Sequence, residues 1–121
     1  MLSVLGAEAM ILVDDMSPCL PNRNWRYREN CHLFCDGDLQ ELHAFAVALG
    51  LRLAWFQNGA ALPHYDLTRR KREQAVRLGA VPVDRQRLVR WVRIWRAAKK
   101  ANMSPERLHR AVQTLYARGW A

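Results

Sequence analysis

The sequence lacks the segments and motifs by which many protein classes are identified. No apolar run is long enough to cross a bilayer, and the N-terminal one is interrupted by Asp14 and Asp15. We therefore expect neither a signal peptide nor a membrane span, and we predict a cytoplasmic protein. A Walker loop, a glycine-rich dinucleotide fingerprint, a nucleophile elbow and a metalloprotease helix motif are absent too. No enzyme class is therefore indicated by a signature of its own.

Cysteine is scarce. Cys19, Cys31 and Cys35 are an odd number in a chain with many core-forming residues, which favours free thiols in a reducing compartment. A structural zinc site usually contains two closely spaced ligand pairs, and only one loose pair is present. On a strand, Cys31 and Cys35 would share one face at about 13 Å, too far apart to ligate one ion. We expect buried thiols.

Acidic residues are scarce in the second half of the chain. Residues 1–66 contain four Arg or Lys and eight Asp or Glu, a balance of −4, whereas residues 67–121 contain fifteen and three, a balance of +12. A basic surface of this kind attracts phosphate groups, nucleic acid or an acidic protein. A solvated helical face would give the same count, so both interpretations stay open.

The size of the chain indicates one globular domain. It has 121 residues, of which 50% are hydrophobic and 25% are charged. We predict an α/β domain over residues 10–92. Residues 1–9 would form a disordered extension, and residues 93–121 a helical extension packed on the same domain.

The pattern of apolar residues predicts short strands that alternate with helices. Strands are expected at residues 10–13, 31–35, 51–56 and 81–83. Helices are expected between Asp38 and Gly50, between Thr68 and Gly79, after Asp84 and after Ser104. This alternation is typical of an α/β fold with a small, mostly parallel sheet of three to four short strands flanked by helices. The last two helices would form a basic C-terminal hairpin.

One polar cluster immediately precedes the helix that begins at Thr68. His64, Tyr65 and Asp66 supply a group that titrates near neutrality together with hydrogen-bond donors and acceptors. Lys71 and Arg72 lie in the first turn of that helix, whose free amides favour an anion. The alternative is that Asp66 only caps the helix while Tyr65 packs in the core.

A second polar cluster is expected where the first two strands end. Asp14 and Asp15 follow the first strand, and His32 and Asp36 lie on or after the second. In a parallel sheet these groups would meet the His64 loop in one crevice, because ligands bind outside the carboxyl ends of the strands. Two His and one or two Asp suit a divalent metal or acid–base catalysis. Turn capping by Asp15 and a structural His32 would explain the same residues.

Two sets of candidate residues follow from these clusters. The expected ligand-binding side chains are Asp14, Asp15, His32, Asp36, His43, His64, Tyr65, Asp66, Lys71 and Arg72. The expected contacts to nucleic acid or a protein partner are Arg69, Arg70, Arg90, Arg93, Arg96 and Lys100.

Several motifs in order along the chain resemble a known family. They are Cys31-His32-Leu33 with Asp36, Glu41 to Ala46, Leu49 to Leu51, His64 to Asp66, Gly79 to Val83 and Leu88 to Arg90. Together they are similar to the uncharacterised bacterial and phage family called domain of unknown function 4031, over about residues 10–92. The resemblance implies a strand that ends in an acid, here Val13-Asp14, but it implies no activity.

The sequence supports ranked hypotheses of function and does not decide whether the protein is an enzyme. The first is that a cleft lined by His, Asp, Tyr and Arg binds a phosphate-bearing small molecule or nucleotide. The alternatives are a metal-assisted or acid–base hydrolase of a phosphoester or nucleotide, a basic nucleic-acid-binding protein, and a protein-binding inhibitor or adaptor. A divalent metal is the cofactor that the residues suit.

Overall fold

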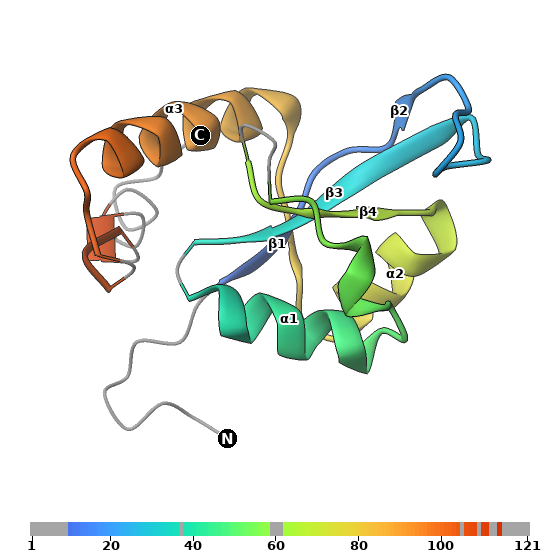
Figure 1. The fold of residues 1–121 in the computed structure, drawn as a ribbon, viewed down its shortest axis with the longest axis horizontal. Coiled ribbons are helices and arrows are strands. Elements are labelled where there is room, and N and C mark those ends of the chain that lie inside the picture. The colour runs from blue at the N-terminus through green and yellow to red at the C-terminus, as the bar shows by residue number, and fades with distance from the viewer. Residues whose placement is uncertain are drawn as a thin grey trace.

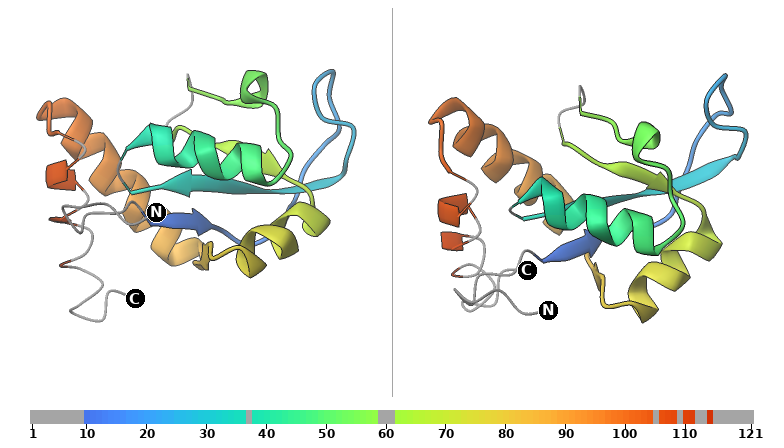
Figure 2. Two further views of the ribbon diagram at one scale, coloured as in Figure 1. Left: turned by 90° about the horizontal axis from the view of Figure 1, so that it is seen from below. Right: turned by 60° about the horizontal axis from the view of Figure 1, so that its bottom comes forward.

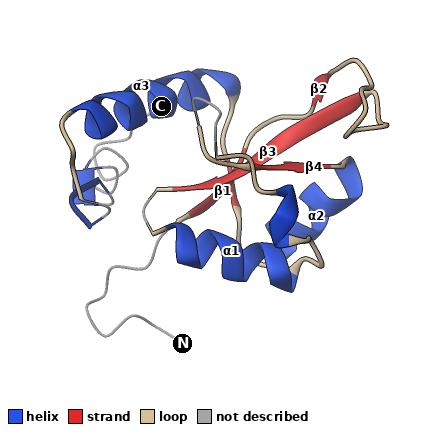
Figure 3. Cartoon of the chain, in the orientation of Figure 1, coloured by secondary structure: helices blue, strands red, loops and turns tan. Residues whose placement is uncertain are grey.

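The chain folds into a central sheet with helices on both faces (Figures 1 and 3). The structure, a computed structural model, describes residues 10–36, 38–58, 62–104, 106–108, 110–111 and 114. The five strands are β1 (Ile11–Val13), β2 (Ser17–Pro18), β3 (Glu29–Cys35), β4 (Tyr65–Leu67) and β5 (Val81–Pro82). The named helices in this part of the chain are α1 (Leu39–Ala48), α2 (Arg69–Arg77) and α3 (Arg85–Lys100), with a short 3₁₀ turn, η1 (Leu53–Trp55). Further helical residues follow α3 from Glu106.

The helix boundaries are set by local signals. The side chains of Asp38, Thr68 and Asp84 accept hydrogen bonds from first-turn amides of α1, α2 and α3, as N-caps do. Gly50 and Gly79 follow α1 and α2 with φ of 82° and 112°, a backbone conformation that glycine adopts most easily. The predictions for these three helices are confirmed.

Strand β3 is the centre of the sheet. It pairs antiparallel with β1, β2 and β4, while β1 pairs parallel with β5. Successive residues of a strand point to opposite faces, so β3 contributes to two cores. Cys31, Leu33 and Cys35 pack in the core under α1 and α2, whereas Phe34 packs in the core under α3. Figure 2 shows α1 and α3 on different sides of β3.

The prediction of a mostly parallel sheet is wrong, although the mixed α/β class is confirmed. β1 and β3 are joined by residues 14–28, which contain no helix. A parallel pair needs a long crossover connection, so β3 returns beside β1 in the opposite direction. The strand ends therefore do not gather at one edge of the sheet.

The prediction of a strand at 51–56 is also wrong. Leu53 to Trp55 form the turn η1 and are exposed on every residue, so this segment lacks the alternating burial of a strand. The strand lies instead at Tyr65–Leu67, in the segment expected to be a loop. The expected extension at 1–9 and most of the last helix lie outside the described residues.

Two further expectations concern membrane spans and thiols. In the described part of the chain, no helix has the length and hydropathy to cross a membrane. Cys19, Cys31 and Cys35 form no disulfide, and the last two are buried as expected. Burial, the largest cause, and the charge of Asp14 raise the pKa of the Cys31 thiol to about 12.

Candidate functional site

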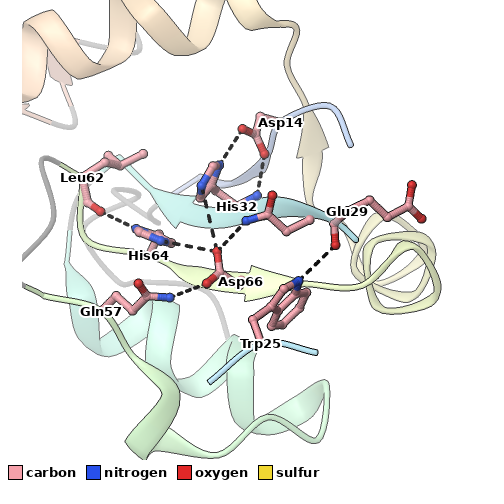
Figure 4. A network of polar contacts seen from close by, with 9 residues as sticks. Asp14, Trp25, Glu29, His32, Gln57, Leu62, His64 and Asp66 are labelled. Carbon is pink, nitrogen blue, oxygen red and sulfur yellow. Dashed lines mark hydrogen bonds and ion pairs between the residues drawn. The ribbon is translucent and has the colours of Figure 1, made fainter. Parts of the chain in front are cut away.

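Four polar side chains, on or next to the adjacent strands β1, β3 and β4, meet on the sheet face that α3 shares. His32 on β3 lies directly opposite Asp66 on β4, and the Asp14 amide donates to the His32 carbonyl at 3.3 Å. His64 precedes Asp66 by two residues and so points to the same face. Figure 4 shows the four side chains converging. Strand pairing, and not a loop, thus holds this cluster together.

His32 is held in one orientation by Asp14. Its Nδ1 lies 2.7 Å from Asp14 Oδ2, and its backbone N–H donates to the other carboxylate oxygen. A carboxylate only accepts, so the ring proton is on Nδ1. The lone pair of Nε2 then faces Asp66, whose Oδ1 is 3.9 Å away.

His64 is held in the same tautomer by the backbone. Its Nδ1 lies 2.6 Å from the carbonyl oxygen of Leu62, which can only accept. Its Nε2 therefore carries the lone pair and lies 3.5 Å from Asp66 Oδ1. The two imidazole rings are arranged edge to face, with centroids 4.7 Å apart.

Asp66 is held by two side-chain amides. Asn30 Nδ2 donates to Oδ1 at 3.1 Å, and Gln57 Nε2 donates to Oδ2. Burial raises the pKa of Asp66, but hydrogen bonds from His64, Gln57 and Asn30 and the charge of His64 lower it by more. His64 can donate to Asp66 only as an imidazolium, since its Nδ1 proton is already bonded to Leu62.

With both rings neutral, three acceptors would face one another, which is unfavourable unless a proton or another positive charge lies between them. One ligand atom from each of His32, His64 and Asp66 lies within 4.8 Å of the others. An ion with tetrahedral bonds of about 2.1 Å keeps its ligand atoms about 3.4 Å apart, close to the two distances from Asp66 Oδ1. A metal ion or a proton satisfies this arrangement.

The cluster is sheltered but reachable from solvent. The side chains of His32, His64 and Asp66 are 33%, 10% and 20% exposed. Burial lowers the pKa of His32, but the hydrogen bond to Asp14 and the charges of Asp14 and Asp66 raise it by more. The net direction is upward, so the neighbours of His32 favour a positive charge on its own ring.

Comparison with known proteins identifies the family of this chain. Residues 11–95 match the family described as protein of unknown function (DUF4031). The chain belongs to this family. The expected resemblance is confirmed, and the DUF4031 match includes all four residues of the cluster. No curated protein and no solved structure matches the chain.

Some of the predicted site residues in this DUF4031 chain lie elsewhere. Asp36 is buried at the other end of the sheet, where its carboxylate accepts from the Met10 amide at 2.6 Å. It was expected beside Asp14 because the strands were expected to be parallel; in an antiparallel pair, the two strands end at opposite edges. Asp15 is exposed and is not part of the cluster's contacts.

His43 and Tyr65 form a separate pair on the opposite face of the sheet. His43 Nδ1 lies 2.7 Å from the Tyr65 hydroxyl, and its ring packs edge to face on Phe56. Tyr65 is fully buried in the core under α1 and α2, and burial raises its pKa. This pair is therefore separated from His64 and Asp66 by the sheet itself.

The basic residues of α2 are mostly engaged with the protein. Arg69 makes a bidentate ion pair with Glu29, with contacts of 2.7 and 3.0 Å. Lys71 Nζ donates to the Leu49 carbonyl, and Arg72 Nε donates to the Asp14 carbonyl at 2.8 Å. The other basic residues predicted to contact nucleic acid or a partner, Arg70, Arg90, Arg93, Arg96 and Lys100, are exposed.

Three residues that orient the cluster, Asn30, Gln57 and Leu62, were not among the predicted site residues. Asn30 could have been found, because it lies two residues before His32 on the same strand and therefore on the same face. Gln57 meets His64 through an isolated bridge outside any strand, and Leu62 acts through its backbone. Neither leaves a signal in the sequence.

A cavity of about 920 Å³ opens beside Asp66. One wall is the segment from Asn22 to Tyr27 and another is the segment from Ala54 to Gln57. Leu51, Thr68 and Lys71 complete the lining. Asp66 therefore borders both this cavity and the histidine cluster.

Proposed function

We propose that this protein is a metal-dependent hydrolase of phosphate-bearing substrates, with a divalent ion bound by His32, His64 and Asp66. The supporting observation is that His32 Nε2, His64 Nε2 and Asp66 Oδ1 converge, while each histidine Nδ1 lies beside an acceptor. Metal-bound histidines usually donate their other ring proton in this way, to a carboxylate or a backbone carbonyl.

Three protein ligands leave a coordination position open for water or substrate. This is the arrangement of catalytic zinc sites, and His and carboxylate ligands also suit Mn²⁺ and Fe²⁺. His32, His64 and Asp66 would hold the ion, which would supply an activated water and polarise the phosphoryl oxygen. In the overall reaction the water oxygen would bond to phosphorus, and the alcohol would leave with the proton that the water gives up.

The surroundings favour an anionic substrate. Lys71 and two arginines, Arg23 and Arg26, line the cavity that Asp66 borders. Cations of this kind recognise phosphate groups. The first hypothesis from the sequence, a cleft for a phosphate-bearing ligand, is retained within this proposal, and the metal ion adds the reaction.

Metal binding is the first test. We expect chelator-stripped protein to bind about one equivalent of Zn²⁺ or Mn²⁺ in isothermal titration calorimetry, and His64→Ala to lose this binding. His43→Ala is the matched control, because His43 lies on the other face of the sheet and should leave the affinity unchanged. Equal metal affinity of His64→Ala and the wild type would refute the site.

Turnover is the second test. The metal-loaded protein should release p-nitrophenol from p-nitrophenyl phosphate or bis(p-nitrophenyl) phosphate, and faster than from p-nitrophenyl acetate. Removing the metal or changing His64 to Ala should abolish this release. Metal binding without hydrolysis of either phosphate ester would contradict the proposed reaction and leave only a binding site.

A further inference from the structure

The cavity beside Asp66 has aromatic walls. Trp25 and Tyr27 line one side, and Trp55 and Phe56 line the other. Trp55 and Tyr27 are 53% and 41% exposed, so large ring surfaces remain in contact with solvent. Exposed aromatic rings gathered around one cavity are a stacking surface for flat ligands, and a nucleobase of any type has such a face.

The wall from Asn22 to Tyr27 is shaped without a ligand. The Asn22 side chain accepts from the amides of Asn24 and Trp25, at 2.8 and 3.0 Å. Trp25 Nε1 donates to the Glu29 carbonyl at 3.1 Å, and its ring meets Tyr27 edge to face. The aromatic rings are thus held in place, which reduces the entropy lost when a ligand binds.

The charge of the cavity lining favours an anion. Arg23, Arg26 and Lys71 are cationic, and Asp66 is the one acid among the lining residues. Arg26 lies over the Tyr27 ring at 5.2 Å, so a cation and an aromatic face are presented together. A sugar phosphate would contact only the cations, and inorganic phosphate would contact even less of the cavity. A nucleotide would contact both the cations and the rings.

We infer that this cavity binds a nucleotide, with its base stacked on the aromatic walls and its phosphate held by the cationic side chains of the lining. The inference names the substrate class of the proposed hydrolase and rests on that proposal only for the reaction. Base recognition depends on residues that are not metal ligands. The nucleotide could be free or the end of a single strand, because both present the same base and phosphate.

The test is calorimetric titration of chelator-stripped protein, so that binding is measured without the metal. The probes are adenosine 5′-monophosphate, ribose 5-phosphate, inorganic phosphate and a 5′-phosphorylated hexathymidylate. We expect the nucleotide to bind at least about tenfold more tightly than ribose 5-phosphate, since base stacking supports a preference of this size. A hexamer that binds more tightly than the monomer identifies a strand end; equal affinities identify a free nucleotide.

Variants separate stacking from other causes. Trp55→Ala should weaken nucleotide binding about tenfold and leave ribose 5-phosphate binding unchanged. Leu53→Ala is the matched control, because Leu53 is equally exposed on the same turn but does not line the cavity. These titrations are made without metal, so a failure of the metal site does not affect this test.

Three results would overturn the inference. One is a ribose 5-phosphate affinity equal to that of the nucleotide, and another is an equal effect of Trp55→Ala and Leu53→Ala. The third is binding to the hexamer that falls steeply with salt but is unchanged by Trp55→Ala, since this indicates contacts to the phosphate backbone alone. None of these three results would contradict the proposed hydrolysis of p-nitrophenyl phosphate, so a failure of this inference is distinguishable from a failure of the proposed function.

Discussion

Single hydrogen bonds decide the chemistry of each histidine. In His32 and His64 an acceptor beside Nδ1 fixes the proton there and leaves Nε2 able to ligate. His43 Nδ1 instead contacts the Tyr65 hydroxyl, which can donate or accept. All three residues are histidines that the sequence alone does not distinguish. Their neighbours in the fold leave Nε2 available as a ligand in His32 and His64.

Replacing Asp14 tests the neighbour of His32. Asp14→Asn removes the charge that makes His32 a strong ligand, so we expect metal affinity to fall about 10- to 100-fold, measured by competition with a chromophoric chelator. Asp15→Asn is the control, because Asp15 is the exposed next residue. Equal losses in the two variants would show a general charge effect and contradict the role of Asp14.

The reactivity of Cys31 tests the burial of the strand that carries His32. The thiolate is the reactive form, and burial raises the pKa of Cys31 to about 12, so at pH 8 the group stays protonated. We expect a thiol-reactive disulfide reagent at pH 8 to modify only Cys19 in the folded protein and all three cysteines in urea. Rapid modification of Cys31 in the folded protein would contradict the packing of β3.

At the scale of elements, local signals were readable and pairings were not. Asp38, Thr68 and Asp84 marked the three helix starts because capping involves residues two or three positions apart. The direction of β3 beside β1 depends on contacts between residues about twenty positions apart. The absence of a helix between these strands was visible in the sequence, and it was the signal for an antiparallel pair.

Gly79 provides a test of the α2 boundary. Its φ of 112° is costly for residues with a side chain, although a Cβ there would meet nothing within 4 Å. Gly79→Ala should therefore lower the free energy of unfolding by about 1–2 kcal/mol through backbone strain alone, measured by urea denaturation. Gly79→Asn should cost less, because Asn tolerates positive φ better. Two equal losses would point to lost packing instead.

For the whole molecule, the sequence identified the members of the site but not how they meet. Asp14, His32, His64 and Asp66 were all expected to bind a ligand, in a crevice outside parallel strand ends. They meet instead across β1, β3 and β4, which pair antiparallel, where the register places His32 opposite Asp66. The alternation of side chains along a strand was enough to predict that His64 and Asp66 share one face. The pairing of that strand with β3, which brings in His32, is known only from the structure.

Because the cluster joins β1, β3 and β4, a bound metal should stabilise the whole fold. An ion that binds only the folded state adds about 2.7 kcal/mol at a concentration of 100 times its Kd. We expect Zn²⁺ or Mn²⁺ to raise the melting temperature and a chelator to reverse the change, measured by differential scanning calorimetry. The His64→Ala variant should show no such rise, and a rise of equal size would indicate binding elsewhere.

Asp66 uses its two carboxylate oxygens in two directions, Oδ1 toward the histidines and Oδ2 toward Gln57 on the cavity wall. A metal ion bound at Oδ1 therefore alters the negative charge that the Asp66 carboxylate presents to a nucleotide in the cavity, and a bound nucleotide alters the charge presented to the metal. Thermodynamic reciprocity then applies: the factor by which a metal ion changes nucleotide affinity equals the factor by which the nucleotide changes metal affinity. One rigid carboxylate would make the two occupants cooperative without any movement of domains.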